Sequence, residues 1–540
     1  MCSVTIAPRK KSGSSAEAAL RAVLSDYEAV TSTTLIDRLE QRGLSRTHAR
    51  QTLFRAQDLP DLWRSEHLVL EAGARIFCWR SFWGSGEYHQ QVASIIQGSR
   101  RGLHRVLLAV RESVALRPEV GKLLAAPMTL RQGQPYPSFE EEVAALVDLG
   151  AVSIEGGGTA LERLSDFRIA ASQTSALAAK AQWAERTIAT ELARILADHL
   201  RRSNFLTWGS MPQKGVGAGI VPFNNLPFDH VGYSRMGPLL RFTKKSAMPS
   251  PTPVVFDVYA KPCPEYAVEA FIERMRRAGM NKTSRLPMVG IVAAPEFSKE
   301  AWSLAKNEGL MAVNLRTMFG DAALEAMAAI ERLLGQAGVS MDAAEEAKDS
   351  DVTHLADVLQ QASGSPIVAD LRSFGFEVMT GLILSQKGWP SIELNSQHLF
   401  KKEEDRDINR ELDVLGRRSA AGDELYAVEC KAEHTAKPLS PDYVGKFFCE
   451  TVPSMVRAER SKGRTPKEVI AEIWTTGQVG QEGRDALNNL SLPHYIKVAR
   501  LLDAKAVGEM VPPSLPACHK LLAAISAPPI EVSPMPRRVR

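Results

Sequence analysis

The chain has 540 residues, of which 44% are hydrophobic and 24% are charged, and its formal net charge is +4. This length is too great for a single hydrophobic core, so we expect three or four domains. The composition is ordinary for a soluble globular protein, and no stretch approaches the roughly 18 apolar residues of a membrane span. The first 15 residues carry charge but no apolar segment, which predicts a disordered lead rather than a secretory signal. We therefore expect a cytoplasmic protein without a membrane partner.

The six cysteines are scattered along the chain and form neither a CxxC pair nor a Cys/His cluster with zinc spacing. Reduced thiols in a cytosolic protein are the expectation, and a structural zinc site is not predicted. No GxxxxGK[ST] or GxSxG motif occurs. The sequence therefore predicts neither a nucleotide-driven motor nor a hydrolase of the nucleophile-elbow type.

Positive charge is concentrated near the N-terminus. Residues 1–110 contain 15 Lys and Arg against 10 Asp and Glu, so this fifth of the chain carries a larger excess than the whole. A basic N-terminal module fits an acidic polymer as partner, although a solvated basic face would give the same count.

The residue pattern at 16–85 is typical of a small helical domain that ends in a β-hairpin. Apolar periodicity predicts two strand-like runs preceded by three helices, at 16–27, 31–42 and 46–56. Three helices and a hairpin resemble the winged helix-turn-helix family, whose third helix enters the major groove of double-stranded DNA. The resemblance implies DNA contacts by Arg46, His48, Arg50 and Arg75. Winged helices also serve as protein–protein modules, and this alternative stays open.

Residues 86–170 show a similar order of predicted elements, with several helices followed by a Gly-rich hairpin at 151–164. A second winged-helix-like domain would explain this order. Arg100, Arg101 and Arg105 would then contact phosphates, which position a protein on DNA without specifying the sequence. A helix-rich connecting domain would look similar.

Residues 171–335 alternate strands with helices after a long amphipathic helix, which predicts a central α/β domain. Asp229 and Asp257 are candidate acidic ligands in this block. Tyr259 follows Asp257 at a spacing that carries a lysine in the C-terminal domain, and Lys261 lies two residues further on. Two interpretations stay open, namely a degenerate copy of the C-terminal fold and an unrelated α/β connector.

Residues 336–352 are acidic, rich in small residues and without apolar periodicity, so we expect a linker there. The Pro-rich and basic character of the C-terminal end predicts a disordered tail within residues 516–540.

Residues 353–515 read as helix, three strands, helix, strand and helix, which predicts an α/β/α domain with a mixed sheet. A helix at 367–386 has a broad apolar side and carries Glu377. Further along, we expect a strand at 471–477 and a final helix at 492–502.

Within that domain, residues 411–433 read as two short strands joined by a polar turn. The second strand alternates, so that Glu429 and Lys431 share one face. Asp413 lies on the first strand, so two carboxylates and a lysine project toward one spot. Burying such charges without a function would be costly, which makes the spot a candidate active site.

A carboxylate on one strand followed by Glu-x-Lys on the next resembles the PD-(D/E)XK nuclease superfamily. The helix with its embedded glutamate and the phrase AVECKAE are similar to those of Mrr-type restriction enzymes and archaeal Holliday-junction resolvases. The resemblance covers about residues 365–490 and implies a restriction-endonuclease-like fold. It also implies catalytic roles for Asp413, Glu429 and Lys431, with Glu377 as a further candidate.

Phosphodiester hydrolysis requires an activated water beside a negatively charged group, and a hard divalent cation supplies that activation. Mg²⁺ binds through one or two carboxylates and keeps several waters. Asp413 and Glu429 are the expected ligands, and the Cys430 carbonyl is a candidate backbone ligand. Lys431 is expected to orient the attacking water and to stabilise its developing charge. Glu377 is either an extra metal or water ligand or a surface glutamate at the polar edge of its helix.

Together these features predict a multidomain, Mg²⁺-dependent DNA endonuclease with N-terminal winged helices that hold duplex DNA. Analogy suggests a role in restriction or genome defence. Cutting both strands with one site per chain would require a homodimer or two successive nicks. The alternatives are a non-catalytic DNA-binding regulator or scaffold on an inert nuclease fold, a structure-specific repair nuclease, and an RNA-directed nuclease.

Overall fold

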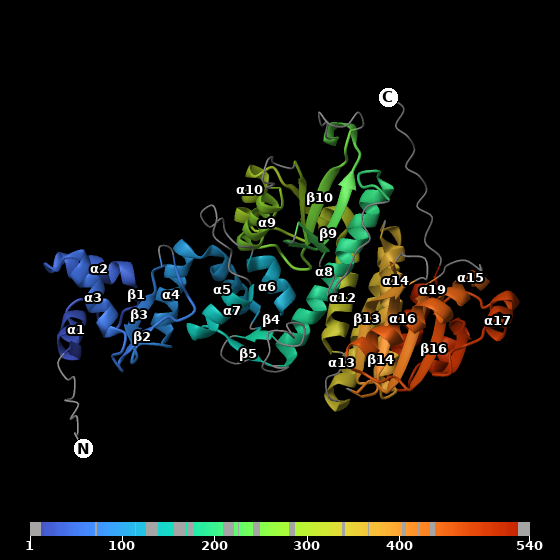
Figure 1. Ribbon diagram of the computed structural model, residues 1–540. Coiled ribbons are helices and arrows are strands. Elements are labelled where there is room, and N and C mark those ends of the chain that lie inside the picture. Colours follow the sequence, from blue (N-terminus) through green and yellow to red (C-terminus); the bar gives the residue numbers. More distant parts are fainter. Residues whose placement is uncertain are drawn as a thin grey trace, which may run out of the picture. The chain divides into compact units, whose positions relative to one another are not determined.

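The protein is a mixed helix-and-sheet chain that packs into two compact units (Figure 1). The first unit comprises Met1–Gln182 with Glu269–Arg277, and the second comprises Trp183–Val268 with Ala278–Arg540. This computed structural model describes residues 12–70, 73–113, 115–125, 139–155, 168–170, 176–208, 221–224, 226–240, 249–279, 287–336, 341–365, 367–401, 407–419, 421–432 and 438–527. Among these residues, none of the helices has the length and apolar character needed to cross a membrane.

The first unit opens with three helices and a small antiparallel sheet. The elements are α1 (Ser12–Arg21), β1 (Val30–Thr31), α2 (Ser32–Gln41), α3 (Arg46–Ala56), β2 (Leu62–Arg64) and β3 (Ile76–Trp79), and the strand order is β1-β3-β2. Ser45 caps α3 by accepting a hydrogen bond from the His48 N–H, as its position before the helix leads one to expect. The helices pack on the sheet around Leu20, Leu35 and Leu53.

The second part of this unit has the same order of elements after one additional helix, α4 (Gly86–Ser99). It comprises α4, α5 (Arg101–Ser113), β4 (Ala115–Leu116), α6 (Pro118–Ala125), α7 (Phe139–Asp148), β5 (Ser153–Glu155) and β6 (Arg168–Ala170), with strand order β4-β6-β5. In the first part, β1 precedes α2 and pairs with β3, the second strand of the hairpin β2–β3. In the second part, β4 precedes α6 and pairs with β6, the second strand of the hairpin β5–β6. Residues 156–164 of the predicted Gly-rich hairpin lie outside the described residues.

The second unit contains two α/β halves. The central half begins with α8 (Ala176–Arg202) and the hairpin β7 (Val221–Phe223) and β8 (Leu226–Phe228). It continues with β9 (His230–Ser234), β10 (Thr252–Val258), α9 (Glu265–Ala278), β11 (Val289–Ala294), α10 (Lys299–Asn307) and β12 (Met311–Asn314). Residues 176–182 of α8 and 269–277 of α9 belong to the first unit. The sheet order is β12-β11-β10-β9, in which β9 alone runs antiparallel. Two helices, α11 (Leu315–Phe319) and α12 (Asp321–Gln336), close this half.

The C-terminal half is a sheet with helices on both faces. After α13 (Met341–Gln361) and α14 (Val368–Gln386) come β13 (Ser391–Lys401), β14 (Asp407–Arg417), β15 (Glu424–Lys431), α15 (Pro441–Lys446) and α16 (Val452–Ser461). The chain continues with β16 (Glu468–Thr475), α17 (Gln481–Asn488), β17 (Ile496–Leu502), α18 (Ala504–Met510) and α19 (Ala517–Ser526). The sheet order is β13-β14-β15-β16-β17, antiparallel up to β15 and parallel beyond it.

One face of this sheet packs on α14 and α18, with α19 against α14, and the other packs on α15 and α16. Along β15, Tyr426 and Val428 enter the first core, whereas Leu425 and Ala427 enter the second. The period-2 alternation predicted for this strand is therefore confirmed.

The linker predicted at 336–352 is wrong from residue 341 onward, where α13 begins. Val352 and Leu355 of this helix are fully buried in the core of the second unit. Packing against α12 and α19 supplies the stabilisation that the local acidic composition does not reveal.

Two further elements differ from the prediction. The segment expected as a final helix at 492–502 contains β17, because parallel pairing with β16 overrides the helix propensity of its Ala, Arg and Leu residues. The first part of the predicted tail, 516–540, contains α19, whose Cys518, Leu521 and Ile525 are fully buried. Residues 528–540 lie outside the described part of the chain.

Candidate active site

The predicted hairpin strands bring the acidic residues together. The antiparallel ladder of β14 and β15 runs from the pair Arg417 and Leu425 to the pair Val414 and Val428. Asp413 and Glu429 are the next opposed residues, so they lie where the ladder between the two strands ends. Lys431 follows Glu429 by two residues and shares its side of the strand.

The ladder on the other side of β14 is interrupted at the same level. Asn395 of β13 has a left-handed backbone with φ of 52°, and it lies between the pairs Leu394 with Val414 and Ser396 with Leu412. Asparagine tolerates this conformation better than most residues. The irregularity stands opposite Asp413, and such irregularities often re-aim a side chain beside a functional site.

Polar contacts fix the three motif residues. The Cys430 N–H donates to Oδ2 of Asp413 at 2.6 Å. The Tyr443 hydroxyl, from α15, donates to Oε1 of Glu429. The Lys431 ammonium lies 4.4 Å from the centre of the Tyr443 ring, a cation–π contact. Tyr443 therefore positions both the glutamate and the lysine.

Two more carboxylates face this pair. Glu377 lies on α14, and burial together with the Asp413 charge raises its pKa well above the ordinary value. Burial and the same charge raise the pKa of Glu411 to about 7, although its surface is more than a third exposed. Glu377 is therefore part of the cluster and not an isolated surface glutamate.

Burial disfavours the ionised forms of these carboxylates. Burial and the Glu429 charge raise the pKa of Asp413 well above its ordinary value, against the opposing effect of the Cys430 N–H. Burial raises the pKa of Glu429 to about 7, although Tyr443 and Lys431 lower it. Burial is the main cause for both groups, with the neighbouring Glu429 charge as a second cause for Asp413, and a bound cation would favour the ionised forms.

The site keeps unused acceptor capacity while staying partly open to solvent. Asp413, Glu429 and Glu377 each retain some accessible surface. Even so, one oxygen of Glu377 and one of Glu429 are buried, and no donor in the described part of the chain reaches them. Buried acceptors without donors are uncommon in folded proteins and suit a cation or an ordered water.

This donor set fits Mg²⁺ in kind, because Mg²⁺ uses one or two carboxylates and keeps several waters. It does not form a complete protein cage. Within the described ranges, no three His, Cys, Asp or Glu side chains are placed so that they could hold one metal ion. Asp413 and Glu429 would be the holding residues, and Glu377 would act through water.

Cys430 contributes through its backbone. Its N–H serves Asp413, and the residue pairs with Trp474 in the ladder with β16. Its thiol lies 3.4 Å from the Thr380 hydroxyl, and burial raises the thiol pKa well above its ordinary value. The sulfur therefore stays protonated and is a poor metal ligand.

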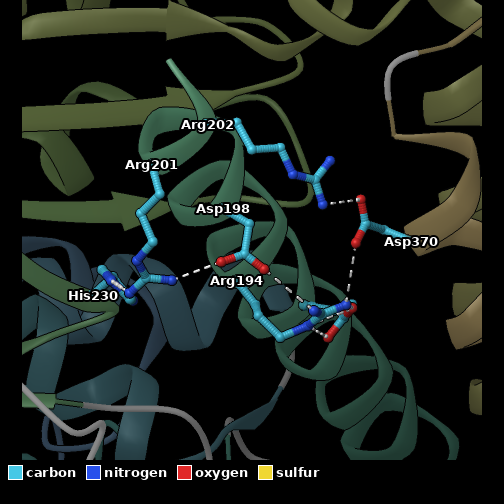
Figure 2. Close-up of polar contacts among 7 residues, drawn as sticks. Arg194, Asp198, Arg201, Arg202, His230 and Asp370 are labelled. Atoms are coloured by element: carbon cyan, nitrogen blue, oxygen red, sulfur yellow. Dashed lines mark hydrogen bonds and ion pairs between the residues drawn. The ribbon is translucent and has the colours of Figure 1, made fainter. Parts of the chain in front are cut away.

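A second group of charges comes from α8, which sequence reasoning missed. Nε of Arg194 lies 3.0 Å from both oxygens of Glu191, and its Nη atoms lie 3.6 Å from Asp198 and 3.9 Å from Asp370 of α14 (Figure 2). The charge of Arg194 lowers the pKa of Glu377 against the dominant effect of burial. Arg194 is therefore a cation beside the carboxylate cluster.

The same stretch of α8 carries two further arginines that Figure 2 shows beside Arg194. Arg201 lies 2.7 Å from Asp198 and 3.3 Å from the His230 ring, and Arg202 lies 3.9 Å from Asp370. These residues lie more than 200 positions upstream of Asp413, so no local sequence pattern links them to the motif.

The predicted DNA-binding residues are only partly free to act. On α3, His48 and Arg50 are exposed, and the exposed Arg46 lies 2.9 Å from Glu40. Arg75 is half-buried and donates from Nη1 to the carbonyls of Ser65 and Glu66 at 2.8 and 2.9 Å. Part of its guanidinium is thus committed to holding a loop.

The three arginines predicted to contact phosphate in the second part of the first unit differ in exposure. Arg101 is exposed. Arg100 is paired with Glu142 at 2.7 Å. Arg105 is 1% exposed and donates to the Leu124 carbonyl, so the prediction of a phosphate contact by Arg105 is wrong.

Comparisons with protein-family models, with curated proteins and with solved structures found no match to this chain.

Proposed function

We propose that this protein is a divalent-metal-dependent endonuclease that hydrolyses DNA in the C-terminal half of its second unit. One observation carries the proposal. Asp413 and Glu429 stand opposite each other where a strand ladder ends, and Lys431 follows on the same face. This is the arrangement that the PD-(D/E)XK resemblance implies, and the sheet with helices on both faces agrees with a restriction-endonuclease-like fold.

Each residue has a role that its contacts support. Asp413, fixed by the Cys430 N–H, and Glu429, fixed by Tyr443, would hold Mg²⁺. When bound, the cation would polarise the phosphate and lower the pKa of a water. Lys431, held over the Tyr443 ring, would orient that water and stabilise charge on the phosphate. Glu377 would accept a proton or order a second water.

The first unit would bind the duplex. Its two parts share the element order and strand order of winged helices, and the exposed face of α3 carries His48 and Arg50 beside Arg46. A helix of this kind reads the major groove while neighbouring cations neutralise phosphates. Arg75 would act mainly by positioning the wing. A restriction or defence role remains an analogy from the resemblance.

A non-catalytic DNA-binding role is the second candidate. It is favoured by the absence, among the described residues, of any set of three metal-ligating side chains. The raised pKa values of four clustered carboxylates argue for the enzyme, because such strain is costly without a function.

The test is cleavage of supercoiled plasmid by the full chain with Mg²⁺. We expect nicked or linear product, none in EDTA, and a loss of about 10²–10³-fold in rate for Asp413→Asn or Lys431→Ala. Lys497→Ala removes an exposed lysine from the same sheet and should cut normally. If the wild type cuts none of a panel of plain, methylated and branched DNAs, the enzymatic proposal fails and the binding role remains.

A further inference from the structure

The two halves of the second unit share one topology, apart from the additional edge strand β13 in the C-terminal half. In the central half, β9 pairs antiparallel with β10, which is followed in parallel by β11 and β12. In the C-terminal half, β14 pairs antiparallel with β15, which is followed in parallel by β16 and β17. The crossover helices are α9 and α10 in one half, and α15 with α16 and α17 in the other. A long helix, α8 or α14, precedes each sheet.

The correspondence extends to the ladder register. The ladder of β9 and β10 ends at the pair His230 with Phe256, so Asp229 and Asp257 are the next opposed residues. Asp413 and Glu429 occupy the same step beyond the last pair of β14 and β15. Two acids thus meet at the end of the antiparallel ladder in both halves.

One hydrogen bond is also repeated. In the C-terminal half, the N–H of the residue after the second acid, Cys430, donates to Oδ2 of Asp413 at 2.6 Å. In the central half, the N–H of Val258, which follows Asp257, donates to Oδ2 of Asp229 at 2.7 Å. Equal topology, register and hydrogen bonding are hard to explain for an unrelated connector.

The two sites differ in the side chain that the helix before the sheet contributes. Where α14 presents Glu377, α8 presents Arg186, which forms an ion pair with Asp229. These two side chains are 8% and 2% exposed, and Asp257 is 1% exposed. In the central half a cation is therefore paired directly with one of the two acids and is buried away from solvent.

The lysine of the motif is absent from the central half as well. Tyr259 stands two residues after Asp257, where Lys431 follows Glu429. Lys261, two residues further on, pairs with Glu185 at 2.6 Å and with Glu331 at 3.5 Å. Its ammonium is thus held outside the acidic pair.

We propose that the central half is a closed second copy of the C-terminal metal site, in which the Arg186 guanidinium occupies the place of a divalent cation. Of these two sites, only the C-terminal one is then metal-dependent. This extension rests on the proposed function for the C-terminal site but makes its own claim about Arg186. A chain with one centre must nick DNA, or act as two copies to cut both strands.

The test counts Mn²⁺ bound to the full chain by equilibrium dialysis and by electron paramagnetic resonance. The wild type should bind one Mn²⁺, and Asp413→Asn with Glu429→Gln should remove it. In that doubly substituted background, Arg186→Ala should restore one Mn²⁺ per chain, because Asp229 and Asp257 then lose their cation. Adding Asp229→Asn should abolish the restored site.

The outcomes separate the two proposals. If the wild type binds no Mn²⁺, the proposal of a C-terminal metal site is refuted. The proposal about the central site is tested separately, by Mn²⁺ binding to the Arg186→Ala chain. A second wild-type Mn²⁺ that Asp229→Asn removes would overturn the closed-site proposal. So would failure of the Arg186→Ala chain to gain Mn²⁺ while its circular dichroism matches the wild type. If Arg186→Ala does not fold without metal, Arg186→Gln replaces it, and the same gain is required.

Discussion

Glu429→Gln should stabilise the metal-free protein at alkaline pH and leave its stability unchanged at acid pH. The folded chain holds the pKa of Glu429 at about 7, against an ordinary value of 4.5. As pH rises from 4.5 to 7, the unfolded chain loses this proton first, so ionisation favours unfolding. The decrease in the free energy of unfolding that comes from Glu429 therefore reaches its full size above pH 7 and is zero below pH 4.5.

The magnitude follows from the pKa difference. At about 1.4 kcal/mol for each pH unit, the two values correspond to about 3 kcal/mol. Glu429 keeps part of its surface accessible, and solvent screening reduces this to about 1–2 kcal/mol. Glutamine retains an oxygen that can accept from Tyr443, so that hydrogen bond need not be lost.

The assay is urea unfolding in EDTA at pH 5 and pH 8.5, with free energies compared between Glu429→Gln and wild type. Glu468→Gln is the matched control, because Glu468 is an exposed carboxylate on the neighbouring strand β16. Adding Mg²⁺ should stabilise the wild type at pH 8.5 and should not stabilise the variant. An effect of Glu429→Gln that is equal at both pH values would refute the reasoning.

Three further predictions concern other parts of the chain. Arg46→Ala with Arg50→Ala should weaken duplex binding and lower its salt slope by about 2, measured by fluorescence anisotropy; unchanged affinity would assign α3 to protein contacts. Glu459→Ala should cost about 3 kcal/mol in urea unfolding, because it removes a buried carboxylate from Arg417 and leaves that buried arginine with Glu393 alone. Tyr443→Phe should move the acid limb of the cleavage profile to higher pH, since the hydroxyl lowers the pKa of Glu429; an unmoved limb would exclude Glu429 as the titrating group.

The hairpin and its site were predictable because their signal is local. The alternation of β15, the turn before it and the spacing of Asp413 from Glu429 all lie within 20 residues. Most helices of the first unit were predictable for the same reason, since caps such as Ser45 act on the next turn.

What the sequence could not show depends on distant partners. Arg194 lies beside the carboxylates only because α8 packs near α14. The burial of Arg105 is likewise set by α6, whose Leu124 carbonyl accepts its hydrogen bond. The strand β17 is a strand because β16 offers it a ladder. In each case a tertiary contact outweighs the local pattern.

The core of the second unit bears on how the protein can be dissected. A continuous set of buried residues runs from Ala184 on α8 through Val352 on α13 to Ile525 on α19, and both sheets contribute to it. A recombinant fragment that starts at the predicted boundary near residue 353 would lack all of α12 and the first half of α13, and would leave a large apolar face in water. Such a fragment should aggregate, whereas one that begins before α8 should stay monodisperse and resist limited digestion between α12 and α14.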